Sequence, residues 1–156
     1  MFYGLALVLM GASLSVFLAG TGSAVGCGIA GRAAAGVTTE SPEKFGLLLL
    51  LQALPGTQGF YGFVGMFLVL TKLTGITLAD ISVAQGLGIF CATLPVGLVG
   101  LTSGISQGKV AAAGCGIVSK RPKEVGKGLI FAVVVETYAV LGLLATVLLL
   151  GNINLG

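Results

Sequence analysis

The stretch Ser41–Gly46 (SPEKFG) sets the architecture, because a counterpart, Arg121–Gly126 (RPKEVG), follows it 80 residues later. Each stretch is short and polar, contains proline and separates two long apolar runs. The alignment extends upstream, where the small-residue run 32–36 lies over 112–116, and downstream, where Gly62 lies over Gly142. The sequence therefore predicts two repeats, residues 1–77 and 78–156, each made of a helix, a short polar loop and a second helix.

Four apolar runs flank these loops, at about 3–37, 45–70, 81–118 and 125–150. Each is long enough to cross a hydrocarbon layer of ~30 Å, which requires about 20 residues. Of the 156 residues, 56% are hydrophobic and only 8% are charged, and there is no histidine. We therefore expect an all-α membrane protein with four transmembrane helices. Two helices return the chain to its starting side, so the two hairpins are parallel.

The basic residues predict the orientation in the membrane. Only Lys72 lies in the connection between the second and third apolar runs. The other seven lysines and arginines lie in or near the connections that follow the first and third runs. Positive residues favour the cytoplasmic side. Loops 38–44 and 119–124 are therefore predicted to be cytoplasmic and both termini extracytoplasmic, in the cell membrane. The net charge of +3 is too small and too scattered to indicate a nucleic-acid partner.

Glycine is abundant, with 27 residues, and it concentrates in the first helix of each repeat. The pairs Gly22/Gly26 and Gly104/Gly108 have the G-x-x-x-G spacing that allows membrane helices to approach closely. This density predicts an inner row of tightly packed helices. A ring of identical copies, lined inside by the glycine-rich helices, would provide such a row.

Glu136 is the one carboxylate expected inside the membrane. It lies about 11 residues, or ~17 Å, from the loop end of its helix, and Gln107 and Gln58 lie at a similar depth on two other helices. A carboxylate at mid-span costs roughly 3 kcal/mol on insertion scales, so it usually has a function. A purely structural, paired carboxylate is the alternative, but no lysine or arginine is expected at the same depth.

The second span supplies further polar groups on one face, at the spacing i, i+3, i+4 and i+7: Leu54, Thr57, Gln58 and Tyr61. Pro55 disturbs the turn before it and loosens a backbone carbonyl. Together with Glu136 and Gln107, these groups form an oxygen-only set with one negative charge, which suits a hard monovalent cation. The equivalent of Glu136 in the first repeat, 80 residues earlier, is Gly56, so the first repeat has no carboxylate at this position. We therefore expect one ion site for every four helices.

Three motifs, LPGTQG at 54–59, QGKVAAAG at 107–114 and VETYA at 135–139, resemble the proteolipid (K, or c) subunit of bacterial V-type ATPases. The resemblance spans the whole chain and is closest to the sodium-pumping members. It implies that Na⁺ is bound by the Leu54 carbonyl, the Thr57 hydroxyl, the Gln58 and Gln107 side-chain oxygens and Glu136. It also implies that Tyr61 hydrogen-bonds the ligating glutamate.

The resemblance further implies a rotor ring of identical subunits, surrounded by lipid and driven by ATP hydrolysis in other subunits. Such a chain is not catalytic alone and needs no organic cofactor. The implied partners are a membrane stator subunit with an essential arginine and a central-stalk subunit at the cytoplasmic loops. Two alternatives remain open at this stage: the same rotor could move H⁺ through Glu136, or the ring could be a structural pore or spacer.

Overall fold

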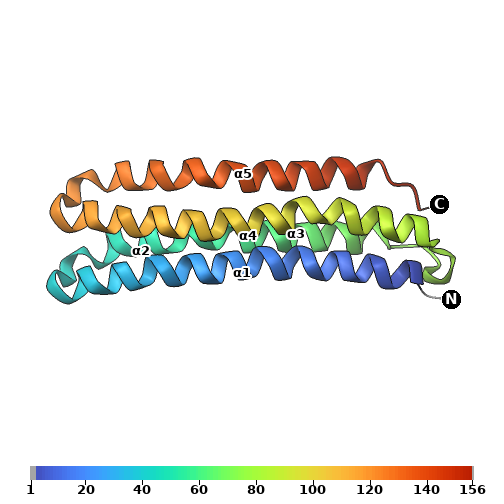
Figure 1. Cartoon of the computed structure of the whole chain (residues 1–156), viewed down its shortest axis with the longest axis horizontal. Coiled ribbons are helices and arrows are strands. Elements are labelled where there is room, and N and C mark those ends of the chain that lie inside the picture. Colours follow the sequence, from blue (N-terminus) through green and yellow to red (C-terminus); the bar gives the residue numbers. More distant parts are fainter. Residues whose placement is uncertain (1–2, 156) are drawn as a thin grey trace.

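The computed structural model describes residues 3–155 and consists of long helices in one bundle (Figure 1). Helix α1 (Tyr3–Glu40) is followed by α2 (Phe45–Ala53) and α3 (Thr57–Lys72), then by α4 (Val83–Lys120) and α5 (Val125–Gly151). Single 3₁₀ turns join them: η1 (Pro42–Lys44), η2 (Leu54–Gly56), η3 (Leu78–Asp80) and η4 (Pro122–Glu124).

Four helical segments are long and apolar enough to cross a membrane, at Tyr3–Glu40, Pro42–Lys72, Val83–Lys120 and Pro122–Gly151. The prediction of an all-α chain with four spans in two hairpins is therefore confirmed. Helix α1 begins and α5 ends at the same end of the bundle (Figure 1), as two parallel hairpins require.

The loops are shorter than predicted. The segment 38–40 still belongs to α1, and 119–120 still belong to α4, so the predicted loops 38–44 and 119–124 are partly helical. In this extension the Thr38 and Thr39 hydroxyls donate to carbonyls one turn back, at Ala34 and Gly36, so their polar groups are satisfied within the helix. At the other end, α4 begins at Val83 rather than Ile81, because Ser82 and Gln85 form a capping box there.

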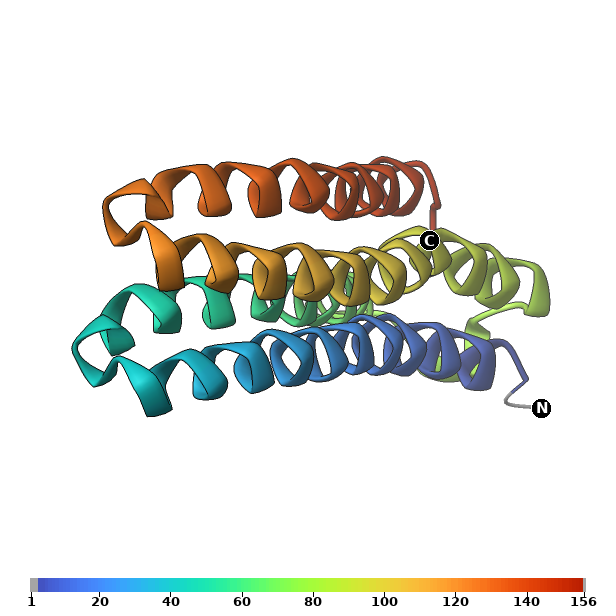
Figure 2. The same cartoon turned by 60° about the vertical axis from the view of Figure 1, so that its left-hand side comes forward.

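The glycine-rich helices α1 and α4 lie side by side and make the most extensive contact in the bundle (Figures 1 and 2). A Cβ atom placed on Gly104 would lie 2.6 Å from the carbonyl carbon of Gly22, and one on Gly22 would lie 2.6 Å from the oxygen of Gly100. The two backbones therefore touch, as the G-x-x-x-G spacing predicted. Helix α3 packs mainly on α1 and also on α4, whereas α5 packs mainly on α4.

Candidate functional site

Glu136, near the middle of α5, lies against side chains from two other helices. The Tyr61 hydroxyl on α3 donates a hydrogen bond of 2.6 Å to Glu136 Oε1. The Gln107 amide on α4 donates one of 3.3 Å from Nε2 to Glu136 Oε2. Both carboxylate oxygens thus have a donor, and three residues that are far apart in the sequence meet at one level of the bundle.

Two glutamines extend this cluster into the interior. Gln58 and Gln107 have no exposed surface, and Gln58 Nε2 donates a short hydrogen bond of 2.6 Å to Gln107 Oε1. Gln107 Nε2 also donates to the Ala132 carbonyl at 3.1 Å. The sequence predicted these two side chains at a common depth, and the structure places them in direct contact beside Glu136.

The proline turn η2 supplies the remaining predicted groups. Pro55 has no N–H, and the helix changes to a 3₁₀ turn at Leu54–Gly56 before α3 begins. The Thr57 hydroxyl donates to the Leu54 carbonyl at 3.0 Å, which holds these two oxygens together. The Gly59 N–H donates across to the Ser23 hydroxyl of α1 at 2.8 Å, so the turn is anchored from outside its own helix.

Sequence reasoning missed Ser103 on α4. Its hydroxyl lies 3.3 Å from Gln58 Nε2 and donates to the Val135 carbonyl at 3.0 Å. Ser103 therefore orients Gln58 and ties α4 to the turn of α5 that carries Glu136. The signal that could have found it was its position, because Ser103 precedes Gln107 by four residues and shares its helix face.

One buried oxygen in the cluster has no partner. Among the residues that the structure describes, Gln58 Oε1 is the buried side-chain polar atom without a hydrogen bond. Leaving such a group unsatisfied costs about 1–3 kcal/mol. An amide oxygen is a suitable ligand for a hard cation, and the carboxylate next to Gln107 supplies the negative charge.

The arrangement differs in one respect from the predicted ligand set. The Gln107 oxygen accepts the hydrogen bond from Gln58, and its amide nitrogen faces Glu136. A cation ligated by both amide oxygens would therefore have to replace the hydrogen bond between Gln58 and Gln107. The residues needed for a cation site are together, but the amides here are paired with each other.

The charge of Glu136 is not balanced by a basic side chain. Within residues 3–155, the ion pair present joins Lys127 to Glu124, 2.7 Å apart at the start of α5. Glu136 lies more than two turns further along the same helix and is partly buried. Its hydrogen-bond partners are a phenol and an amide, which are neutral donors. The site can therefore accept one positive charge.

Comparison with known proteins gives the family. The model of the family described as the C subunit of ATP synthase matches residues 10–69 and again 90–149. The chain is 50% identical over 149 residues to the V-type sodium ATPase subunit K of Enterococcus hirae, covering 96% of this chain and 93% of the relative.

A second relative is the A-type ATP synthase subunit K of Methanocaldococcus jannaschii. It is 42% identical over 147 residues, which make up 94% of this chain and 63% of that protein. The family model matches twice, 80 residues apart, and both relatives align over nearly the whole chain. This multi-pass membrane protein is therefore a member of the ATP synthase C-subunit family.

Proposed function

We propose that this chain is the rotor-ring subunit of a V-type ATPase and that it binds Na⁺ at Glu136 and carries it across the membrane. ATP hydrolysis in other subunits drives the movement, and the chain by itself catalyses no reaction. The observation that carries the proposal is the meeting of Glu136, Gln107 and Gln58 with one buried amide oxygen left unpartnered. The relative with 50% identity, a subunit of a sodium ATPase, supports Na⁺ over H⁺.

Each residue of the cluster has a role in this proposal. Glu136 supplies the charge, and the Gln58 and Gln107 oxygens, the Thr57 hydroxyl and the Leu54 carbonyl complete an oxygen shell. Tyr61 holds the carboxylate through its hydrogen bond to Oε1. On entry, Na⁺ replaces the hydrogen bond between the two glutamines and also satisfies Gln58 Oε1.

Charge neutralisation explains how the carboxylate of the site can face lipid while the ring turns in the membrane. A bare carboxylate facing hydrocarbon is costly, whereas a carboxylate that has bound Na⁺ is neutral overall. Moving one charge against 100 mV costs ~2.3 kcal/mol, so transport against the potential needs an energy source such as ATP. One carboxylate in four spans gives one ion for each copy of the chain.

The same proposal assigns the partners. Identical copies form a ring within lipid, and a stator subunit with an essential arginine displaces the ion from Glu136. The two polar turns at η1 and η4, with most of the basic residues, face the cytoplasm and dock the central stalk, whereas both termini are extracytoplasmic. Residues 1–77 and 78–156 act as two hairpin units, of which the second carries the glutamate.

Carbodiimide labelling tests the ion. The reagent modifies a protonated carboxyl group, so bound Na⁺ should protect Glu136 in membranes that contain the complete pump. We expect millimolar NaCl to slow the labelling at a pH where it proceeds readily, whereas the same concentration of choline chloride should not. Labelling that is insensitive to Na⁺ would favour H⁺ as the transported ion.

Replacing Gln107 tests the proposed shell. The variant Gln107→Ala removes one oxygen ligand and the donor to Glu136 Oε2. Interactions with a charged group contribute about 1.5–3 kcal/mol, so we expect the Na⁺ concentration for half-protection to rise about tenfold or more. Gln52→Ala on α2, outside the cluster, is the matched control and should leave protection unchanged. An unaltered Na⁺ affinity in Gln107→Ala would remove Gln107 from the shell.

A further inference from the structure

The side-chain amide of Gln58 has two ends that a cation would meet very differently. The oxygen, Oε1, can ligate a cation, and it has no partner among the residues that the structure describes. The nitrogen, Nε2, donates to Gln107 Oε1 at 2.6 Å and to Ser103 Oγ at 3.3 Å. An amide N–H is a donor and repels a cation, so the direction of this amide decides whether Gln58 favours or opposes ion binding.

Helix α5 fixes this direction through a backbone carbonyl, which can only accept hydrogen bonds. The Val135 carbonyl accepts the Ser103 hydroxyl at 3.0 Å. A hydroxyl has one proton to donate, so Ser103 offers only its lone pairs to Gln58 and can receive Nε2 but not Oε1. A relay of defined polarity therefore runs from Val135 through Ser103 to Gln58, and it leaves Oε1 free for an ion.

Gln107 is oriented by the same helix without an intermediate side chain. Its Nε2 donates to the Ala132 carbonyl at 3.1 Å and to Glu136 Oε2 at 3.3 Å. A carbonyl and an ionised carboxylate only accept hydrogen bonds, so the Gln107 oxygen must point away from both. Gln107 thus keeps its direction without Ser103, whereas the direction of Gln58 depends on another side chain.

Ser103 matters most when an ion occupies the site. In the proposed site Na⁺ takes the Gln107 oxygen, and Gln58 Nε2 then loses the shorter of its two hydrogen bonds. Ser103 Oγ is the acceptor that remains for it. Gln58 has no exposed surface and Ser103 is only 5% exposed, so water has little access to replace this contact.

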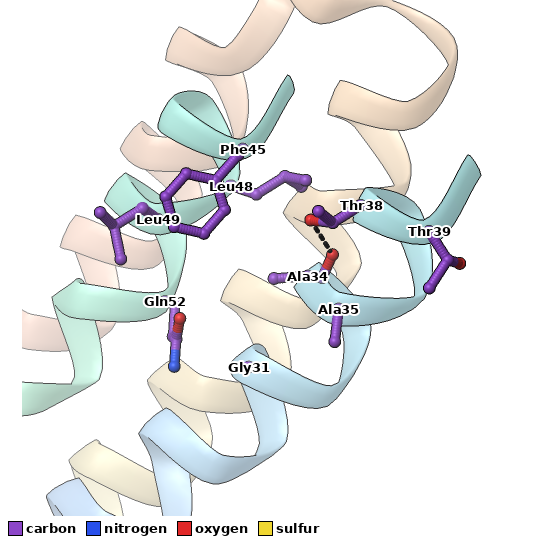
Figure 3. Close-up of a pocket in the computed structure, with 9 residues that line it drawn as sticks. All are labelled: Gly31, Ala34, Ala35, Thr38, Thr39, Phe45, Leu48, Leu49 and Gln52. Atoms are coloured by element: carbon purple, nitrogen blue, oxygen red, sulfur yellow. Dashed lines mark hydrogen bonds between the residues drawn. The ribbon is translucent and has the colours of Figure 1, made fainter. Parts of the chain in front are cut away.

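Gln52, in the same span as Gln58, shows an amide without such a relay. It lines a cavity of about 420 Å³ between α1 and α2, beside Gly31, Leu48 and Leu49. Figure 3 shows no hydrogen bond from Gln52 to the other residues that line this cavity. These neighbours do not determine which end of the amide faces the cavity. A glutamine in a membrane span therefore presents its oxygen in a fixed direction only where its partners impose that direction.

The equivalent serine of the first repeat, Ser23, makes a different contact. Its hydroxyl accepts the Gly59 N–H at 2.8 Å, so it holds a backbone group rather than an amide side chain. The equivalent of Gln58 in the second repeat is Tyr138, which has no amide to orient. The relay through a serine to an amide thus lies at the contact between hairpins that carries Glu136.

We infer that Ser103 is a positioning residue that sets the Na⁺ affinity of the site by holding the Gln58 oxygen toward the ion. Without its hydroxyl, Gln58 Nε2 lacks an acceptor in the ion-bound state, or the amide turns over and directs N–H groups at the cation. Either change weakens Na⁺ binding. Neither alters the carboxylate of Glu136, whose own donors are Tyr61 and Gln107. The inference rests on the proposed function and adds to it a residue that does not ligate the ion.

Ser103→Ala tests the inference in membranes that contain the complete pump. The readout is the Na⁺ concentration that gives half-protection of Glu136 against carbodiimide. We expect this concentration to rise about tenfold, as for a buried polar group that loses its partner. The rate of labelling without Na⁺ should stay the same, because both donors to the carboxylate are kept.

Two further variants separate the hydroxyl from a general effect on α4. Ser106→Ala is the matched control, since it removes the same group from an exposed position three residues along the helix. It should leave both the half-protection concentration and the labelling rate unchanged. Ser103→Thr keeps a hydroxyl on the same carbon atom and should restore most of the Na⁺ affinity that Ser103→Ala loses.

An unchanged half-protection concentration in Ser103→Ala would overturn the inference. A comparable change in the labelling rate without Na⁺ would also overturn it, because that result indicates a general disturbance of the site. So would rings of Ser103→Thr that form in normal amount but bind Na⁺ as weakly as those of Ser103→Ala. If Na⁺ does not protect the unaltered chain, the proposed function itself fails. If Na⁺ protects the unaltered chain and Ser103→Ala equally, only the role of Ser103 fails.

Discussion

Replacement of Glu136 by glutamine is expected to abolish carbodiimide labelling of this chain and to reduce sodium transport by the complete pump to background. Glutamine has nearly the same size, and its oxygen can still accept the hydrogen bond from Tyr61. It has no charge, however, and Glu136 is the acidic residue of the site. The remaining oxygens are neutral and would not hold Na⁺ at millimolar concentration.

The measurement is ²²Na⁺ uptake into inverted vesicles that contain the assembled complex, together with gel analysis of the ring. Rings should form in normal amount, because the change keeps the volume of the side chain. Asp80→Asn in η3 removes a carboxylate that is exposed at the opposite end of the bundle from the stalk-docking turns, and should leave uptake unchanged. Coupled transport by Glu136→Gln would instead support a structural role for the ring.

Replacement of Gly104 by valine is expected to have the largest effect on the fold. A Cβ atom at this position would lie 2.6 Å from the carbonyl carbon and 2.8 Å from the oxygen of Gly22, and 2.9 Å from the nitrogen of Ser23. All three are backbone atoms, so no flexible side chain can move away. Overpacking typically costs about 1–3 kcal/mol, and a backbone contact along two long helices should be at or above the upper end.

The expected outcome is a failure to recover rings from membranes, or a large decrease in their thermal stability in detergent. Gly126→Val is the matched control, because nothing lies within 4 Å of a Cβ atom at Gly126. It makes the same change of residue in α5 without a steric conflict, so the ring should remain stable. Similar behaviour of the two variants would show that the contact between α1 and α4 is less close than described.

The spans could be predicted because their signals are local. Runs of apolar residues, two proline-containing turns and an 80-residue repeat predicted four helices with bounds within a few residues of those observed. The errors lie at the ends, where Thr38, Thr39 and Ser82 make hydrogen bonds that hydropathy does not report. Glu136, Gln58 and Gln107 were recognisable as polar residues at a common depth for the same reason.

The contacts among those residues could not be predicted in detail. They depend on how each helix is rotated about its axis. That rotation decides which atoms of Gln58 and Gln107 face each other, that Ser103 contacts Gln58, and that Gln58 Oε1 has no partner. Helices α2 and α5 are apolar almost all round, so hydrophobic periodicity does not reveal that rotation.

By itself, the sequence determined the number of spans, the two hairpins and the single carboxylate in the membrane, because chain length and hydropathy act within one helix at a time. Only the tertiary structure decided that Gln107 turns its amide nitrogen toward Glu136 and its oxygen toward Gln58, and that Ser103 joins the cluster. The reason is steric. Backbone contacts at Gly22 and Gly104 fix the spacing and rotation of α1 and α4, and every other side chain is placed relative to that contact.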